Sequence, residues 1–174
     1  MKKRLFILLA LGVAFMPSFA YAEGTLEPQR LTAISQGCTV IQTILDQLQR
    51  RDLVARTNRG RAYEAQIKQI DAFTQRMQTN NLSTQALDGP AIQFKAEVDA
   101  FRSAYVQYDD RMSTLRQIDC RTKSESFATA LEQVRVLRQE VGAEVTKGEE
   151  SLALYRQALT GLRAILPDAK GGTQ

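Results

Sequence analysis

The sequence predicts an all-α fold, an up-down-up antiparallel three-helix bundle of long, coiled-coil-like helices that follows an N-terminal signal peptide. Apolar residues recur at alternating spacings of three and four in three long segments, which is the heptad pattern of helices that pack lengthwise. Turn signals separate the segments, and the two cysteines lie at equal distances from the first of these turns. We expect helices at about residues 30–79, 90–121 and 123–166, together forming one domain at 30–166.

The first 22 residues have the features of a secretory signal peptide. Three basic residues, at positions 2 to 4, precede an apolar run from Leu5 to Met16, and Ala20-Tyr21-Ala22 is a small-x-small cleavage site. We therefore expect removal of residues 1–22, a short lead at 23–29, and export to the periplasm, the cell surface or the medium. The alternative is a retained membrane anchor, for which the apolar run is short and is broken by Pro17.

Net charge gives no indication of a nucleic-acid partner. The chain has 23 Lys and Arg against 19 Asp and Glu, but three of the basic residues lie in the signal segment, which leaves 20 basic against 19 acidic residues in the remaining 152 of 174. Such a balance excludes overall charge as a reason to bind nucleic acid. A chain of this length is sufficient for one domain with its own core.

The first segment carries an apolar heptad seam that changes phase part-way along. The seam residues before the change are Leu31, Ile34, Cys38, Ile41, Leu45 and Leu48. From Asp52 to Arg61 the core positions are polar, and the apolar register resumes one residue later at Tyr63. This shift indicates a stutter in one long helix or a break near Gly60. We favour continuity to the turn at Thr79-Asn80-Asn81, because glycine costs only about 1 kcal/mol in a helix interior.

The central segment has the clearest core-facing stripe. Its members are Ala91, Phe94, Val98, Phe101, Tyr105, Tyr108, Met112 and Leu115. At heptad spacing the aromatic rings are expected in the core rather than on a ligand-binding surface. Asp88-Gly89-Pro90 indicates a cap followed by proline at the first helical position, so this helix is expected to start near residue 90, with residues 84–87 as a short turn or compact loop.

The last helix begins at a capping-box pattern, Thr122-Lys123-Ser124-Glu125, in which two side chains satisfy the first free backbone amides. Its seam runs from Phe127 to Leu166, and Pro167 ends it. Residues 167–174 are expected to be a flexible tail.

The two cysteines, Cys38 and Cys120, are expected to form a disulfide, because the chain is predicted to be exported. Their midpoint is residue 79, where the first turn begins, so an antiparallel hairpin that turns there places the two sulfurs level. Closing a loop of roughly 80 residues would stabilise the fold by about 4–5 kcal/mol in the chain-entropy model.

The sequence contains no recognisable catalytic, cofactor-binding or metal-binding pattern. It has no histidine, which is the commonest general base and a frequent metal ligand, and it lacks nucleophile elbows, phosphate-binding loops and zinc spacings. The acidic pairs Asp109-Asp110 and Glu149-Glu150 are adjacent on helices, so their side chains point about 100° apart toward solvent. We therefore predict that the protein is not an enzyme and uses no cofactor.

The most distinctive polar stretch is residues 50–61. It contains five arginines, namely Arg50, Arg51, Arg56, Arg59 and Arg61. They are candidates for binding the phosphate or carboxylate groups of lipids, polymers or a partner. The other interpretation is a set of interhelical ion pairs. Counting along the predicted bundle places five carboxylates near this stretch, those of Asp109, Asp110, Glu132, Glu140 and Glu144.

A set of residues, mostly in the first helix, forms a pattern known from other proteins. It comprises Arg30, Leu31, Ile34, Cys38, Asp52, Val54, Arg56, Asn58, Arg59, Gly60, Tyr63, Glu64 and, further on, Cys120. The pattern resembles a group of small exported helical proteins of unknown role from Saccharibacteria and similar reduced-genome bacteria. The resemblance implies an envelope location and no established activity. The LTxxQ motif of small periplasmic chaperones does not match, because Leu31-Thr32 is followed by glutamine one place too late, at Gln36.

These observations predict an exported, non-enzymatic structural or interaction protein of the cell envelope, with a protein partner there or with copies of itself. A periplasmic holdase-type chaperone is one alternative, and a module that binds anionic lipid or polymer through the five arginines is another. We expect no nucleic-acid partner. Membrane contact is expected only through the signal segment or an anionic surface.

Overall fold

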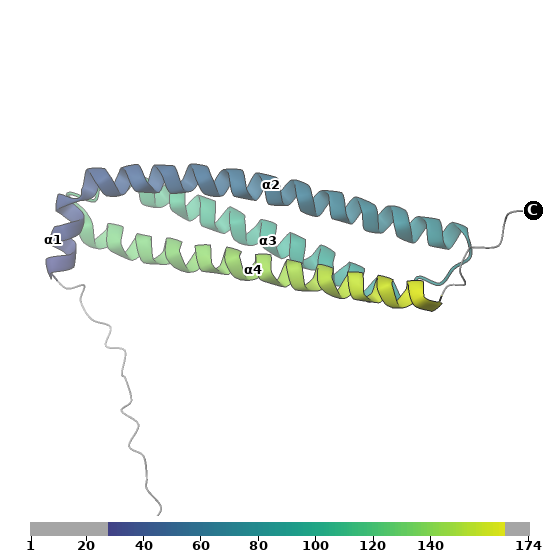
Figure 1. The fold of residues 1–174 in the computed structure, drawn as a ribbon. Coiled ribbons are helices and arrows are strands. Elements are labelled where there is room, and N and C mark those ends of the chain that lie inside the picture. The colour runs from purple at the N-terminus through teal and green to yellow at the C-terminus, as the bar shows by residue number, and fades with distance from the viewer. Residues whose placement is uncertain (1–27, 166–174) are drawn as a thin grey trace, which may run out of the picture.

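The computed structural model describes residues 28–165, which form four helices: α1 (Pro28–Gln36), α2 (Cys38–Thr79), α3 (Gln85–Arg116) and α4 (Ser124–Ile165). The predicted all-α class is confirmed, since these residues contain no strand. The long helices α2, α3 and α4 lie along one axis, and the short α1 lies across one end (Figure 1). None of these helices is long and apolar enough to cross a membrane. The predicted signal peptide, most of the lead and the tail lie outside the described residues.

The first predicted helix is divided in two, because the chain breaks at Gly37 rather than near Gly60. Gly37 has φ −85° and ψ 4°, and a Cβ atom there would lie 3.1 Å from the Ala33 carbonyl oxygen. The close approach lets α1 turn across the bundle end, where the Ser35 hydroxyl donates a hydrogen bond of 3.0 Å to the Arg121 carbonyl. The predicted continuity of the helix through Gly60 is confirmed, and the start moves from Arg30 to Pro28.

The predicted start of the central helix at Pro90 is wrong, because α3 begins five residues earlier and contains the proline. Leu87 is completely buried, so it extends the apolar seam by one turn before Ala91. Burying a leucine contributes about 2–3 kcal/mol, which offsets most of the roughly 3 kcal/mol that an internal proline costs. Thr84 supports the early start by donating a hydrogen bond of 3.2 Å to the Asp88 carboxylate.

The connection between α3 and α4 is longer than predicted, since α3 ends at Arg116 instead of near Arg121. The Asp119 carboxylate organises this connection by accepting bonds of 2.9 Å from the Arg121 amide and the Thr122 hydroxyl. Thr122 is therefore bonded to Asp119, in place of the expected capping box, and α4 starts at Ser124.

The core is centred on α3. Every residue of its predicted apolar stripe is buried, including all four aromatic rings. One half of the core surrounds the Cys38–Cys120 disulfide, and the other surrounds Tyr63, Phe94 and Tyr155. The Cα atoms of Cys38 and Cys120 are 5.5 Å apart, so the disulfide joins the start of α2 to the connection that precedes α4.

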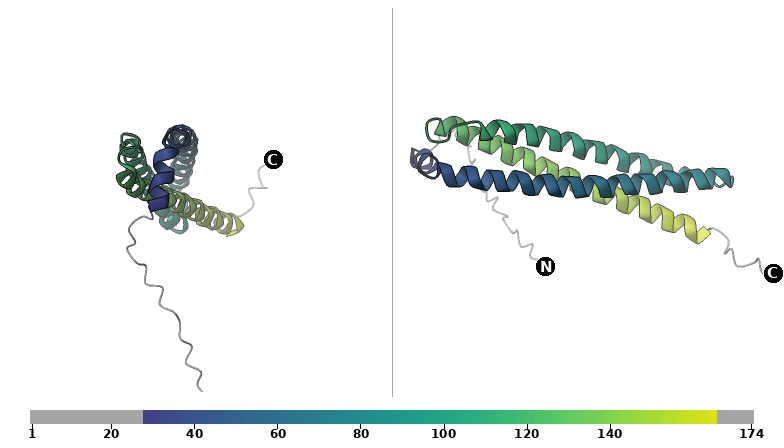
Figure 2. Two further views of the ribbon diagram at one scale, coloured as in Figure 1. Left: turned by 90° about the vertical axis from the view of Figure 1, so that its left-hand side faces the viewer. Right: turned by 90° about the horizontal axis from the view of Figure 1, so that it is seen from above.

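The three long helices do not pack equally closely. The closest packing is between α3 and α4, whereas no Cα atom of α2 lies within 8 Å of a Cα atom of α4. Figure 2 shows α4 crossing the other long helices at an angle, so that its C-terminal end projects away from α2. Contact between α2 and α4 is consequently made by side chains, as where Tyr63 of α2 packs against Gly148 of α4.

Candidate functional site

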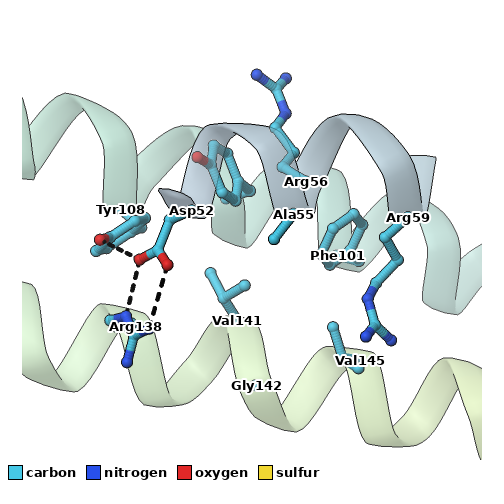
Figure 3. Close-up of a pocket in the computed structure, with 11 residues that line it drawn as sticks. Asp52, Ala55, Arg56, Arg59, Phe101, Tyr108, Arg138, Val141, Gly142 and Val145 are labelled. Atoms are coloured by element: carbon cyan, nitrogen blue, oxygen red, sulfur yellow. Dashed lines mark hydrogen bonds and ion pairs between the residues drawn. The ribbon is translucent and has the colours of Figure 1, made fainter. Parts of the chain in front are cut away.

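The candidate site is a cavity of about 300 Å³ at the middle of the bundle, between α2, α3 and α4. It explains the polar interruption in the first seam. No residue of α2 between Leu45 and Tyr63 is buried, and in this stretch Asp52, Arg56 and Arg59 line the cavity. Tyrosines and Phe101 of α3 form its floor, and valines of α4 form the opposite wall (Figure 3).

Asp52 is the centre of a hydrogen-bond network that joins all three helices. Its Oδ2 atom accepts a bond of 2.7 Å from the Tyr108 hydroxyl and one of 2.8 Å from Arg138 Nε. Its Oδ1 atom accepts a second bond from Arg138, at 3.1 Å. The pair with Arg138 is bidentate, the geometry in which Arg–carboxylate contacts are strongest. Figure 3 shows Asp52 reaching from α2 to both partners.

The protonation states of this network are fixed. Burial acts to raise the pKa of Asp52, but the hydrogen bonds from Arg138 and Tyr108 outweigh it and lower that pKa below its ordinary value. Burial, reinforced by the bond to Asp52, raises the pKa of Tyr108. Asp52 therefore stays ionised and Tyr108 stays protonated near neutral pH. A carboxylate with both oxygens occupied is a poor general base, which makes proton transfer an unsuitable role for this site.

A second tyrosine gives the cavity an unsatisfied polar atom. The Tyr105 hydroxyl is buried and has no hydrogen-bond partner among residues 28–165. The guanidinium carbon of Arg56 lies 4.7 Å from the centre of its ring, within the range of a cation–π contact. Burial and the nearby carboxylates of Asp109 and Asp52 raise the pKa of Tyr105, so it remains a neutral hydrogen-bond donor.

One end of the cavity is closed by an ion pair across the bundle. Arg59 of α2 donates a bond of 2.7 Å to Glu149 of α4. Both side chains are more than a third exposed, so the pair contributes little to stability in water. Its effect is to bridge two helices whose backbones stay apart.

The five predicted arginines are not brought together. Arg56 and Arg59 line the cavity, whereas Arg50, Arg51 and Arg61 are exposed on α2 and do not line it. Arg59 pairs with Glu149, and none of the five predicted carboxylates lies within salt-bridge distance of any of these arginines in the described chain. The other ion pairs of the described chain involve basic residues outside this stretch.

The central pair of the site, Asp52 and Arg138, was not predicted. A signal for it exists in the sequence, because Asp52 lies seven residues after the core residue Leu45 and so falls on the inward face of the helix. A carboxylate there requires a cationic partner from another helix. That partner is 86 residues away in the sequence, and the pattern does not identify it.

The site has no evident means of holding a metal ion. Within residues 28–165, no group of three or more Asp, Glu, His or Cys side chains is arranged to coordinate one.

No family model matches the chain. Comparison with curated proteins and with solved structures likewise finds nothing similar to it.

Proposed function

We propose that the protein is an exported, non-enzymatic helical protein that acts by binding another protein at the cell envelope. The observation that supports this most is the separation of the α2 backbone from the α4 backbone, which leaves hollows between the two helices. The charged groups that bridge the two helices, Asp52 with Arg138 and Arg59 with Glu149, are held in ion pairs and hydrogen bonds. They suit a binding surface better than a reaction centre.

The proposed functional unit is an up-down-up three-helix bundle of α2, α3 and α4, with α1 and the disulfide fastening one end. A disulfide is typical of oxidising compartments, which supports export to the periplasm or the cell surface with residues 1–22 as the signal. A disulfide-fastened rod about 60 Å long, from 42 helical residues at about 1.5 Å each, offers a large surface for a partner.

Crosslinking of the protein in living cells, followed by mass spectrometry, tests this function. We expect one abundant envelope protein among the captured species. A non-reducing gel of the same sample should show the disulfide-bonded monomer. Capture of many unrelated proteins at low abundance would favour a chaperone, and links only between copies of the chain would favour a structural oligomer. Turnover of a substrate that depends on specific side chains would disprove the non-enzymatic role.

A holdase chaperone is the first alternative, and it is favoured by large apolar side chains of α2 that are exposed to solvent. Val40, Ile44 and Val54 are 64%, 56% and 60% exposed. Such a chaperone should suppress aggregation of an unfolded model client at near-stoichiometric ratios. Absence of suppression would exclude it.

Binding to an anionic lipid or polymer is the second alternative. It is favoured by the exposure of Arg50, Arg51 and Arg61, which have no carboxylate partner among the described residues. Sedimentation with phosphatidylglycerol vesicles should then weaken as salt rises and disappear when the three arginines are replaced by glutamate. Binding that is indifferent to both changes would count against it.

A further inference from the structure

Three hollows of about 380, 300 and 480 Å³ follow one another between α2 and α4. Tyr63 of α2 separates the last two, because its ring packs against Gly148 of α4. We call the three hollows together the α2–α4 groove. Its walls are residues 41–48 with 131–138, residues 52–59 with 138–145, and residues 66–76 with 152–159. The lining is mostly apolar, with Leu45 and Ile70 of α2 and Val141 of α4 among its members and with Phe101 of α3 on the floor of the middle hollow.

Charged residues of α2 are sorted between its two sides. On the side toward α3, its acidic residues form ion pairs with basic residues of α3; the pairs are Asp46–Arg116, Glu64–Arg102 and Asp71–Lys95. On the side toward α4, three basic residues line the groove, and they are Arg59, Lys68 and Arg76. The groove side of α2 is therefore basic.

The opposite wall is basic too. Helix α4 contributes Arg135, Arg138 and Arg156, and α1 contributes Arg30. The acidic side chains that reach across the groove in the described chain are Asp52 and Glu149, and an arginine of the groove already binds each of them. An apolar floor between two basic walls therefore remains, with positive charge in excess.

We propose that the α2–α4 groove binds an amphipathic helix of a partner protein, one with an aliphatic stripe and glutamate or aspartate along both flanks. The proposal rests on the proposed function and names the chemistry of the partner. Helices dock into grooves of this kind through apolar side chains at three- and four-residue spacing. An added helix would complete a four-helix bundle, and the acidic flanks would face the two basic walls.

The geometry favours a helix over the other occupants. From residue 41 to 76 the groove is about 50 Å long, and the Asp52–Arg138 and Arg59–Glu149 pairs cross it. A helix can lie above these pairs and place apolar side chains into the separate hollows, whereas a lipid acyl chain would need an unbroken floor. The chain's own residues 1–22 carry three basic residues and no acidic ones, so the charge of the walls opposes them.

A binding experiment with two synthetic peptides tests the chemistry. The first is a fluorescent helical peptide with a leucine heptad stripe and glutamates on both flanks, and the second is identical except for lysines on the flanks. We expect the acidic peptide to bind at least about tenfold more tightly and to weaken as salt rises. Equal binding of the two peptides, or affinity of the acidic peptide no better than about 1 mM, would overturn the proposal.

Charge reversal locates the binding surface. Arg76→Glu and Arg156→Glu change groove residues that form no ion pair within the described chain, so they should fold as the parent does. Their combination should weaken the acidic peptide at least about tenfold. The control is Arg50→Glu, since Arg50 lies two heptads before Glu64, on the α3 side of α2. An equal effect of the control would show that binding is nonspecific.

Two further measurements distinguish other occupants, and a third separates this proposal from the proposed function. If the double variant loses binding to vesicles but still binds the peptide, the groove is a lipid site. A concentration-dependent dimer abolished by that variant would make a second copy the occupant, and either result overturns the proposal. The third measurement uses photo-crosslinkers in cells, one in place of Ile44 on the groove and one in place of the exposed Val106 of α3. The crosslinker at Ile44 should capture an acidic helical segment, and the crosslinker at Val106 should not. Capture of one partner at Val106 alone would keep the proposed function and remove the groove from it.

Discussion

Removing either side of the Asp52–Tyr108 hydrogen bond should destabilise the bundle by an amount that the geometry sets. Tyr108 is 1% exposed, and its hydroxyl donates to Asp52 at 2.7 Å. Tyr108→Phe leaves Asp52 with its two bonds from Arg138, so we expect a loss of about 1.5 kcal/mol. Asp52→Ala leaves a buried hydroxyl without an acceptor, and we expect a loss of about 2.5 kcal/mol. Because Arg138 is half exposed, water replaces its lost partner at small cost.

The double variant is the informative one. In the double variant of Asp52→Ala and Tyr108→Phe, no buried polar group is left unpaired, so it should be no less stable than Asp52→Ala alone. Its loss is then smaller than the sum of the two single losses by about 1.5 kcal/mol, which is the coupling energy. Urea unfolding followed by far-UV circular dichroism gives each free energy. Glu150→Ala is the control, because Glu150 is exposed and forms no ion pair within residues 28–165. Additive losses would show that the two side chains are not coupled, and a loss below about 0.5 kcal/mol in Asp52→Ala would mean that water satisfies Tyr108.

The same network predicts a pH dependence. The pKa of Asp52 is lower in the folded protein than its ordinary value, so the carboxylate stabilises the fold above the unfolded-state pKa of about 3.9. That contribution is lost as the pH falls through the lower folded-state pKa. Unfolding free energies of the parent should therefore fall more steeply with acidification below about pH 4 than those of Asp52→Asn. Parallel pH curves for the two proteins would contradict the assignment.

Four other changes test the packing. Reducing the disulfide should lower the unfolding free energy by about 4.5 kcal/mol, which is the chain-entropy estimate for a closed loop of 82 residues. A loss under about 1 kcal/mol in urea unfolding would show that the loop is already restrained in the unfolded chain. Gly142→Ala should stabilise α4 by about 1 kcal/mol, because nothing lies within 4 Å of the new Cβ atom. Gly148→Ala should gain less or lose stability, because its Cβ atom would lie 3.1 Å from the Tyr63 hydroxyl oxygen; equal shifts in melting temperature for the two glycine variants would argue against this contact. Pro90→Ala should stabilise α3 by about 1–2 kcal/mol through the restored backbone hydrogen bond, and an unchanged melting temperature would show that the helix start already compensates for the proline.

The features that the sequence predicts well are those that one helix determines by itself. The apolar stripe of α3 is buried in full, because three- and four-residue spacing fixes one face of a helix whatever its neighbours are. The continuity of α2 through Gly60 follows from the modest cost of a single glycine. Pairing of Cys38 with Cys120 is predictable as well, since it needs only the position of the first turn.

The features that were missed depend on contacts between distant segments. The break at Gly37 is set by the packing of α1 across the bundle end, where Ser35 reaches the carbonyl of Arg121, 86 residues away. Pro90 lies inside α3 because burial of Leu87, one turn earlier, offsets most of the cost of an internal proline. In both cases the tertiary gain outweighs a local signal that is typical of a helix boundary.

The candidate site shows the same limit. An arginine-rich stretch is visible in the sequence, but the phase of α2 relative to the other helices decides that Arg59 reaches Glu149 of α4 and Arg56 lies over Tyr105 of α3. Arg50, Arg51 and Arg61 are exposed instead. That phase comes from the packing of both helices against α3. Sequence spacing along α2 alone does not contain it.

The polar stretch of α2 and the open groove have one physical cause. A helix with Asp52 and Arg59 at inward positions cannot bury that face against α4, because an unpaired charge in an apolar core is far too costly. The helices instead stay apart and are joined by long side chains, Arg138 and Glu149, that span the space. Apolar residues of similar volume would serve stability as well or better, and they would also let the two helices close. The charges are therefore best explained by what they keep open, which is a basic-walled groove in the middle of a bundle that its own three long helices do not fill.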